Sequence, residues 1–348
     1  MTPSAAPSAT RRGSAVAIRL AVAIGLTAYI VWKSHPAAVL AALAGADWRP
    51  MTAAVLLVLV DRALNFYRWL ILLCIVDPAT RPPVAQILRI FFVSTFVGTF
   101  LPASIGGEAV RAYSLARLDV RATDSVATVL MDRMLGLAST LVMALIGLAL
   151  VRDLLTSPAI VASLALAAAA CGATLLLVFN TRAAQVAARV AERLPQATRP
   201  AVEGMLISVT RYRSHHGELI NVLLCSLGVQ LLRIVQAYYL GRGLGVMAPL
   251  SAYLAFIPLI LLVMLLPVTF NGIGTSQVAF VSFFARIGVP SAPAVALSVF
   301  FVALGIVGNL PGGLLYAFGR AARSGPRAAD RVSPARETAA DPSRNRLA

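Results

Sequence analysis

The sequence predicts an all-α polytopic membrane protein, and three observations lead to this fold class. Of its 348 residues, 59% are hydrophobic and only 13% are charged, whereas about 25% of the residues in a soluble domain are charged. The apolar residues form long runs, without the period-two alternation of transmembrane barrel strands. Most of the arginines stand between these runs or near the two ends of the chain.

Apolar runs of about 20 residues are long enough to cross a bilayer as helices. The first candidate is longer than the hydrophobic part of a cleaved signal, which has about 7–15 residues, so we interpret it as a retained helix. Two further apolar stretches, Ile87–Leu101 and Leu250–Val268, lead into breaks that contain proline and glycine. The six candidate spans are Ala15–Trp32, Met51–Val76, Val126–Val151, Pro158–Phe179, Leu219–Leu240 and Pro293–Phe318.

The distribution of arginines predicts the topology, because cytoplasmic loops are enriched in Lys and Arg. Arginines are concentrated in the N-terminus, in the basic loop 180–218 and in the tail from Arg320. We therefore expect a multi-pass protein of the inner (plasma) membrane with these three segments, and so both termini, in the cytoplasm. Counting passes then requires Ile87–Leu101 and Leu250–Val268 each to return to the face from which it entered.

This count gives about six spanning helices plus two re-entrant broken segments that enter from opposite faces. The alternative, eight simple spans, also keeps both termini inside, but it places the six arginines of the loop 180–218 outside, against the positive-inside rule. In both cases residues 15–320 form a single transmembrane domain. Residues 1–14 and 321–348 are basic, lack apolar periodicity and are expected to be disordered.

Two parts of this domain, about 51–151 and 219–318, resemble each other. Each carries an arginine, an amide side chain three residues later and a tyrosine five residues later. The predicted topology sends the two arginine-bearing helices in opposite directions, so the repeat is inverted. The matching residues are Arg62, Asn65 and Tyr67 in the first part and Arg233, Gln236 and Tyr238 in the second.

A Leu-Pro pair followed by small hydroxyl residues and glycines recurs downstream in both parts. Proline removes a backbone donor and glycine permits unusual turns, so helices should break there within the membrane, where unpaired backbone groups must face a cavity or buried protein. Matched breaks in an inverted repeat point to a transporter site, and a helix that starts at such a break can bind phosphate. The alternative is that they are ordinary breakers at helix ends. The residues are Pro102, Ser104, Gly106 and Gly107, and Pro267, Asn271, Gly272, Gly274, Thr275 and Gln277.

Several charged residues fall inside the predicted spans, where each costs roughly 2.5–3.5 kcal/mol on insertion scales and usually faces a cavity. Glu108 and Arg111 are three residues apart and are spaced to pair on one helix face. Arg68 is expected near the membrane interface instead. Arginine forks match phosphate geometry, so we expect a cavity that binds an anionic headgroup. Its expected lining is Arg62, Glu108, Arg111, Asp132, Arg133 and Arg233.

The sequence carries no signature of another function class. The net charge of +16 would suggest nucleic acid on a soluble protein, but no soluble domain and no basic-aromatic pattern accompany it. Cys74, Cys171 and Cys225 stand singly in apolar segments, without the spacing of a disulfide framework or zinc site. We therefore expect no metal, no cofactor and no catalytic residue.

The broken segments carry a family resemblance. The segment from Phe100 to Arg111 resembles the first signature of the lysylphosphatidylglycerol synthase transmembrane-region family, also called flippase-like proteins. Thr128–Arg133 is similar to the next element of that family, an acid-arginine pair, and Leu266–Thr275 is similar to the third. The resemblance covers roughly residues 15–320. One departure is Gln277, which stands where members of the family often carry a glutamate.

The resemblance implies translocation of a phospholipid or lipid-linked anionic headgroup between leaflets. In full-length synthases the membrane region moves an aminoacylated lipid that a separate cytosolic domain makes, and this chain is interpreted as lacking that transferase domain. The expected partners are membrane lipids and enzymes of envelope-lipid biosynthesis. Two alternatives stay open: an intramembrane transferase for polyprenyl-phosphate or glycolipid substrates, with Glu108 as its base, and an accessory scaffold for such enzymes.

Overall fold

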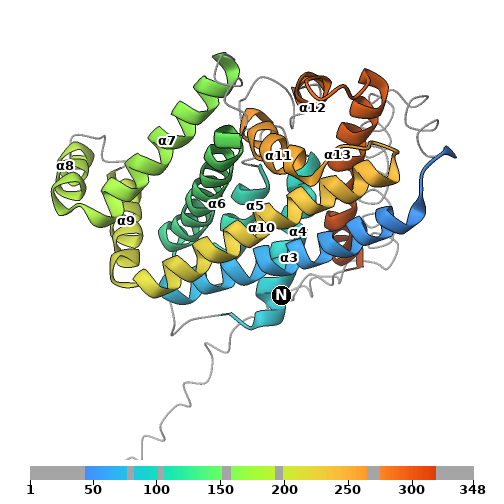
Figure 1. Ribbon diagram of the computed structural model, residues 1–348. Helices are drawn as coiled ribbons and strands as arrows, with labels where there is room; N and C mark the ends of the chain where they lie inside the picture. The colour runs from blue at the N-terminus through green and yellow to red at the C-terminus, as the bar shows by residue number, and fades with distance from the viewer. Residues whose placement is uncertain are drawn as a thin grey trace, which may run out of the picture.

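A computed structural model describes residues 44–76, 82–100, 106–118, 120–150, 158–192, 199–264 and 275–318. Throughout these ranges the regular elements are helices (Figure 1). The expected first span, Ala15–Trp32, and both terminal segments lie outside the described residues. The helices are α3 (Trp48–Val76), α4 (Val84–Phe100), α5 (Gly106–Ala116), α6 (Ala122–Leu150), α7 (Pro158–Phe179), α8 (Thr181–Glu192), α9 (Arg199–Thr210), the 3₁₀ turn η2 (Arg211–Ser214), α10 (His216–Gly243), α11 (Leu250–Met264), α12 (Thr275–Ala285) and α13 (Ser291–Phe318).

The prediction of a polytopic α-helical membrane protein is confirmed. Each expected span within the described residues coincides with one helix: α3, α6, α7, α10 and α13. Among the described residues, four segments are long and apolar enough to cross a bilayer, namely α6, residues 161–179 of α7, α10 and α13. Helix α3 has 29 residues and carries three charged side chains in its interior, Asp61, Arg62 and Arg68.

Helices α3 and α10, which bear the matching arginines, lie side by side and antiparallel (Figure 1). The amide of Asp47, just before α3, donates to the carbonyl of Gly243 at the end of α10, at 3.0 Å. At the opposite end, the Tyr212 hydroxyl, just before α10, donates to the carbonyl of Leu72, at 3.1 Å. The opposite directions inferred for the two repeats from the arginine distribution are therefore confirmed for this pair.

The first broken segment is an antiparallel helical hairpin of α4 and α5. A Cβ on Gly98 would lie only 2.7 Å from the Cα of Gly107, so the two backbones touch where the hairpin turns. Farther from the turn, the Arg111 Nε donates to the Ser94 hydroxyl at 3.2 Å. The chain thus runs back along the path by which it came, as a re-entrant segment must.

The second broken segment, α11 and α12, has the same shape. Phe256 near the middle of α11 packs against Phe283 and Phe284 at the end of α12, with ring centroids 5.6 and 5.5 Å apart. Tyr253, one turn earlier on α11, also contacts Phe284, at 5.2 Å. Two hairpins in matching places favour the re-entrant topology over eight simple spans.

The second long helix of each repeat packs against the hairpin of the other repeat. Helix α13 lies along α4 of the first hairpin, and α6 lies along α11 of the second. A Cβ on Gly147 of α6 would meet the carbonyl of Ala255, and one on Gly312 of α13 would meet the carbonyl of Phe92. Gly312 follows Gly147 by 165 residues, the same offset that separates Pro267 from Pro102. Small residues let helix backbones approach closely in membranes, and both repeats use this device at the equivalent place.

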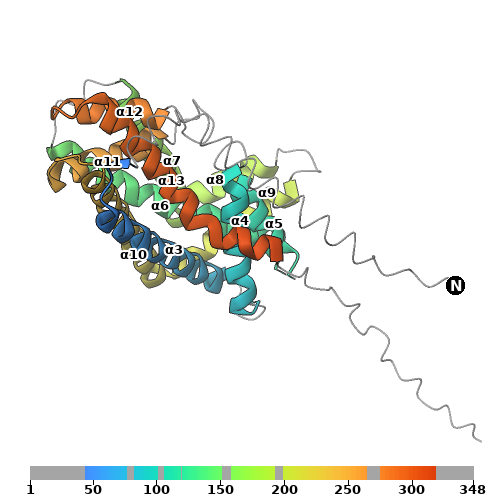
Figure 2. The ribbon, with the colours of Figure 1, turned by 90° about the vertical axis from the view of Figure 1, so that its right-hand side faces the viewer.

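The basic segment 180–218 is not the loop that the sequence suggested. It contains α8, α9 and η2, which lie beside α7 at one end of the bundle (Figures 1 and 2). Helices α8 and α9 have only 12 residues each, too few for a span. Polar residues interrupt both of them, so neither contains the long apolar run by which a span is recognised in a sequence.

A buried carboxylate fastens this segment to the membrane helices. Asp124, in the first turn of α6, accepts a hydrogen bond from the Ser208 hydroxyl of α9 at 2.5 Å. The Arg211 guanidinium lies 3.5 Å from the same carboxylate and also donates to the carbonyl of Val76 at the end of α3. Burial raises the pKa of the neighbouring Tyr212 hydroxyl well above its usual value, so the hydroxyl stays a neutral donor.

Candidate functional site

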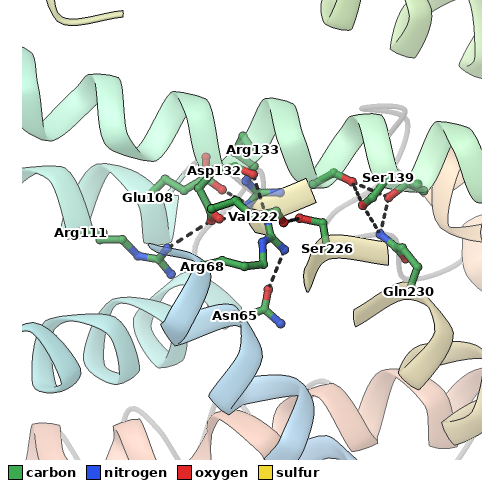
Figure 3. Close-up of polar contacts among 12 residues, drawn as sticks. Asn65, Arg68, Glu108, Arg111, Asp132, Arg133, Ser139, Val222, Ser226 and Gln230 are labelled. Carbon is green, nitrogen blue, oxygen red and sulfur yellow. Dashed lines mark hydrogen bonds and ion pairs between the residues drawn. The ribbon is translucent and has the colours of Figure 1, made fainter. Parts of the chain in front are cut away.

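Charged and polar side chains from α3, α5, α6 and α10 meet inside the helical bundle (Figure 3). Five arginines and three carboxylates take part. They form two groups in which one carboxylate is shared by two arginines, and one simple pair. We call this set the charged cluster; its members are Asp61, Arg62, Arg68, Glu108, Arg111, Asp132, Arg133 and Arg233.

The first group is centred on Asp61, which is 1% exposed. Its Oδ2 lies 3.7 Å from the Arg62 Nε, and its Oδ1 lies 3.4 Å from the Arg233 Nε. The two arginines that occupy matching positions in the repeats therefore converge on one carboxylate. Both distances are those of ion pairs, and Asp61 Oδ1 and Arg62 Nε make no hydrogen bond within the described part of the chain.

The second group is centred on Asp132 of α6. The Arg68 Nη2 donates to its Oδ1 at 2.8 Å and to its backbone carbonyl at 3.0 Å, and the Arg111 Nη1 lies 3.7 Å from its Oδ2. Asn65 connects the two groups, because its Nδ2 donates to Asp61 Oδ2 at 3.2 Å while its Oδ1 accepts from Arg68 at 3.3 Å. Arg68 itself is buried inside the protein, at 4% exposed.

Arg111 is held on all sides by the first hairpin and by α3. Its guanidinium carbon lies 4.7 Å from the ring centroid of Phe91 and 5.1 Å from that of Trp69. Its Nε and Nη2 donate to the Ser94 and Thr95 hydroxyls, both at 3.2 Å. Stacking on aromatic faces stabilises a cation in an apolar setting. Because Arg111 also pairs with Asp132 of α6, it joins the hairpin to that helix.

Glu108 pairs with Arg133 of α6 and not with Arg111, its neighbour one turn along the same helix. The expected Glu108–Arg111 pair is therefore wrong, because Arg111 is turned towards α4 and Asp132. Glu108 stands in the first turn of α5, where the positive end of the helix favours an acidic side chain. The arginines differ in access: the Arg133 side chain is 43% exposed and that of Arg233 31%, whereas those of Arg68 and Arg111 are at most 10% exposed.

Two of the arginines pack directly against glycines, where a larger residue would collide with the guanidinium group. A Cβ on Gly308 of α13 would lie 2.9 Å from the Arg62 Nε, and one on Gly136 of α6 would lie 3.2 Å from the Arg68 Nη2. Larger residues at these places would push the guanidinium groups away. Helices from both repeats thus shape the walls around the cluster.

The broken-helix residues are only partly described. Gly106 and Gly107 begin α5, and Thr275 begins α12; helices therefore start at the glycine breaks, as expected. Gln277 lies in the first turn of α12, half-buried. The remaining motif residues, Pro102, Ser104, Pro267, Asn271, Gly272 and Gly274, lie outside the described residues.

The structure adds three residues that the sequence analysis did not place at the site: Asp61, Asn65 and Arg68. They are spaced by four and three residues along α3, which puts them on one helix face. That spacing is the signal in the sequence that could have found them. Gln230 of α10 extends the polar zone, since its Nε2 donates to the Thr140 hydroxyl of α6 at 2.5 Å (Figure 3).

In this conformation each arginine of the charged cluster forms an ion pair with a carboxylate of the cluster. A cavity of about 190 Å³ does open between α6, α7 and α10, but its lining is almost entirely apolar and includes Met131, Cys171, Leu219 and His216. The charged cluster lies on other faces of α6. Arg133 and Arg233 are the more accessible arginines of the cluster, whereas Arg68 and Arg111 are enclosed.

Residues 16–312 match the family described as the lysylphosphatidylglycerol synthase transmembrane region. The chain belongs to this family. The match spans nearly the whole transmembrane domain, so the charged cluster and both hairpins lie within it, and it places the chain in a family related to membrane lipids. A comparison with curated proteins finds no match.

Proposed function

We propose that this protein translocates a lipid with an anionic, phosphate-bearing headgroup between the leaflets of the cell membrane. The observation that carries the proposal is a charged cluster with more arginines than carboxylates, enclosed by apolar helices of an inverted repeat. Membership in a membrane-lipid family supports a lipid as the substrate. Inverted repeats with broken helices are the architecture of transporters with alternating access.

In this proposal the headgroup binds at the more exposed arginines, Arg133 and Arg233. Its phosphate replaces Glu108 at Arg133 and Asp61 at Arg233, so the carboxylates act as stand-ins for the ligand when the site is empty. Such an exchange limits the time for which a charge is left unpaired in a medium where unpaired charge is costly. Relative movement of the two hairpins then exposes the cluster to one leaflet and afterwards to the other.

The direct test is leaflet accessibility of labelled phospholipids in proteoliposomes, with the protein present or absent. We expect the wild type and Arg182→Gln, an exposed arginine of α8 outside the cluster, to translocate an anionic phospholipid. Arg133→Gln and Arg233→Gln, shown to be folded by their thermal unfolding, should translocate at least about tenfold more slowly. The proposal fails if the wild type moves no lipid from a panel of anionic, zwitterionic and polyprenyl-phosphate lipids, or if both cluster variants match the wild type.

A further inference from the structure

The charges of the cluster do not balance, and the imbalance has a definite pattern. Asp61 is shared by Arg62 and Arg233, and Asp132 is shared by Arg68 and Arg111. Each of these two groups carries one uncompensated positive charge. Glu108 and Arg133 form a neutral pair. The cluster as a whole therefore carries two positive charges more than its carboxylates neutralise.

Among the described residues, the other polar neighbours do not remove this excess. Arg111 is surrounded by the Ser94 and Thr95 hydroxyls, and Arg68 by the Asn65 amide and a backbone carbonyl. These groups accept hydrogen bonds but carry no charge. In addition, Nε of Arg62 and Nε of Arg68 are buried without a hydrogen-bond acceptor within the described part of the chain. The site thus offers both spare positive charge and spare donors.

The two groups are joined closely enough to act on one ligand. Asn65 bonds to Asp61 in one group and to Arg68 in the other. Arg133 follows Asp132 directly on α6, and Asp132 pairs with Arg68 at 2.8 Å. One anion among these arginines would neutralise both groups.

We propose that the headgroup is a dianion: a lipid phosphomonoester or diphosphate rather than a phosphodiester. This inference rests on the proposed function and names its substrate class. A phosphomonoester carries about −1.5 to −2 charge at pH 7 and has three acceptor oxygens, enough to neutralise the cluster and to face Arg62, Arg133 and Arg233 together. A phosphodiester carries a single negative charge and leaves one positive charge buried.

The test compares lipids that differ only in the headgroup. The purified full chain in a non-ionic detergent is titrated with phosphatidic acid, phosphatidylglycerol and phosphatidylcholine of identical acyl chains, with thermal stabilisation as the readout of binding. At pH 7.5 we expect phosphatidic acid to bind at least about tenfold more tightly than phosphatidylglycerol. Inorganic phosphate at the same concentrations should have a far smaller effect. If phosphatidylglycerol binds as tightly as phosphatidic acid, the inference that the headgroup is a dianion is overturned. If inorganic phosphate binds as tightly as phosphatidic acid, the inference that the ligand is a lipid is overturned.

Acidification provides a second, independent readout. The second proton of a phosphomonoester binds with a pKa of about 6, so the advantage of phosphatidic acid should shrink between pH 7.5 and pH 5. The site is also faced by three carboxylates, those of Asp61, Glu108 and Asp132. Any effect of pH on them changes the binding of both lipids, so the affinity for phosphatidylglycerol measured at each pH corrects for that effect. A preference that stays unchanged at pH 5 would contradict recognition of the dianion.

Two variants locate the effect. Arg233→Gln removes one positive charge, so phosphatidic acid and phosphatidylglycerol should bind within about threefold of each other, whereas Arg182→Gln should keep the full preference. Arg133→Gln serves as a second cluster variant if Arg233→Gln is poorly folded. Translocation is measured separately. If phosphatidic acid binds preferentially but no lipid is translocated, the proposed function is overturned and the dianion site is retained. If lipids are translocated without a preference for phosphatidic acid, the dianion site is overturned and the proposed function is retained.

Discussion

The two repeats share one backbone plan but differ in what they place inside it. In both, a long arginine-bearing helix is followed by a hairpin and a second long helix. With the 165-residue offset, Arg111, Asp132 and Arg133 of the first repeat correspond to Ser276, Leu297 and Ser298 of the second. The first hairpin contributes charge, and the second contributes stacked rings of Phe280 and Phe284, 5.8 Å apart.

This difference separates scaffold from chemistry. The features common to both repeats are the helix order, the hairpins and the close glycine contacts at Gly147 and Gly312, and they define how the halves pack. The charges present in one repeat alone define what can bind. Arg233 is the exception, because it brings a cation from the second repeat to a carboxylate of the first. Substitutions at matching places in the two repeats can test this division.

Asp132→Asn should cause the largest loss of stability. The change leaves both Arg68 and Arg111 beside a neutral amide, and breaking a buried ion pair by removing one partner costs about 3–5 kcal/mol. The measurement is the free energy of unfolding in mixed detergent micelles. Leu297→Met, at the corresponding place in the second repeat, conserves side-chain volume and should cost less than about 1.5 kcal/mol. Equal losses in the two variants would show that the repeats do not differ in this respect.

Asn65→Leu and Gln236→Met compare the two matching amides directly. Asn65 hydrogen-bonds to Asp61 and Arg68, and bonds to charged groups contribute about 1.5–3 kcal/mol. Gln236 is buried, but its Nε2 has no hydrogen-bond partner among the described residues, and replacement of an unsatisfied group by an apolar one of similar shape is nearly neutral. The same unfolding assay should therefore show a loss for Asn65→Leu alone. A loss of similar size in Gln236→Met would assign that amide a partner.

Gly107→Ala tests the turn of the first hairpin. The new Cβ would lie 2.7 Å from the carbonyl oxygen of Ser94 and 2.8 Å from the Cα of Gly98, and overpacking of this kind costs about 1–3 kcal/mol. Gly305→Ala in α13 is the control, because a Cβ there meets nothing within 4 Å in the described structure. The control should unfold like the wild type. An unaffected Gly107→Ala would mean that the hairpin opens without cost.

The sequence predicted the long helices well and the pairing within the site poorly, for physical reasons. Length and apolarity set a span almost alone, so Pro158–Phe179 was predicted with the bounds that the structure gives. Ion pairs depend on which helices become neighbours. Local spacing favoured Glu108 with Arg111, but the fold brings α6 against α5 and supplies Arg133 and Asp132 as closer partners.

The short helices α8 and α9 escaped prediction for a different reason. Each has only 12 residues and is interrupted by polar side chains, so neither contains a long hydrophobic run, and the density of arginines alone suggested a loop. The carboxylate of Asp124 that fixes them stands in the first turn of α6, and its partners Ser208 and Arg211 are more than 80 residues away along the chain. A contact of that sequence separation leaves no local pattern to read.

Arg233→Gln should have the smallest effect on stability and a large effect on translocation. Its side chain is 31% exposed and its Nε lies 3.4 Å from Asp61 Oδ1, and partly exposed ion pairs contribute about 1 kcal/mol or less. Arg62→Gln, at the matching position in α3, changes a side chain that is only 16% exposed and packed beside Gly308, so it should lose more stability. Lipid translocation and thermal unfolding are measured on the same preparations. If Arg233→Gln translocates at the wild-type rate while Arg62→Gln does not, the second repeat supplies scaffold alone, and all the chemistry of the site belongs to the first.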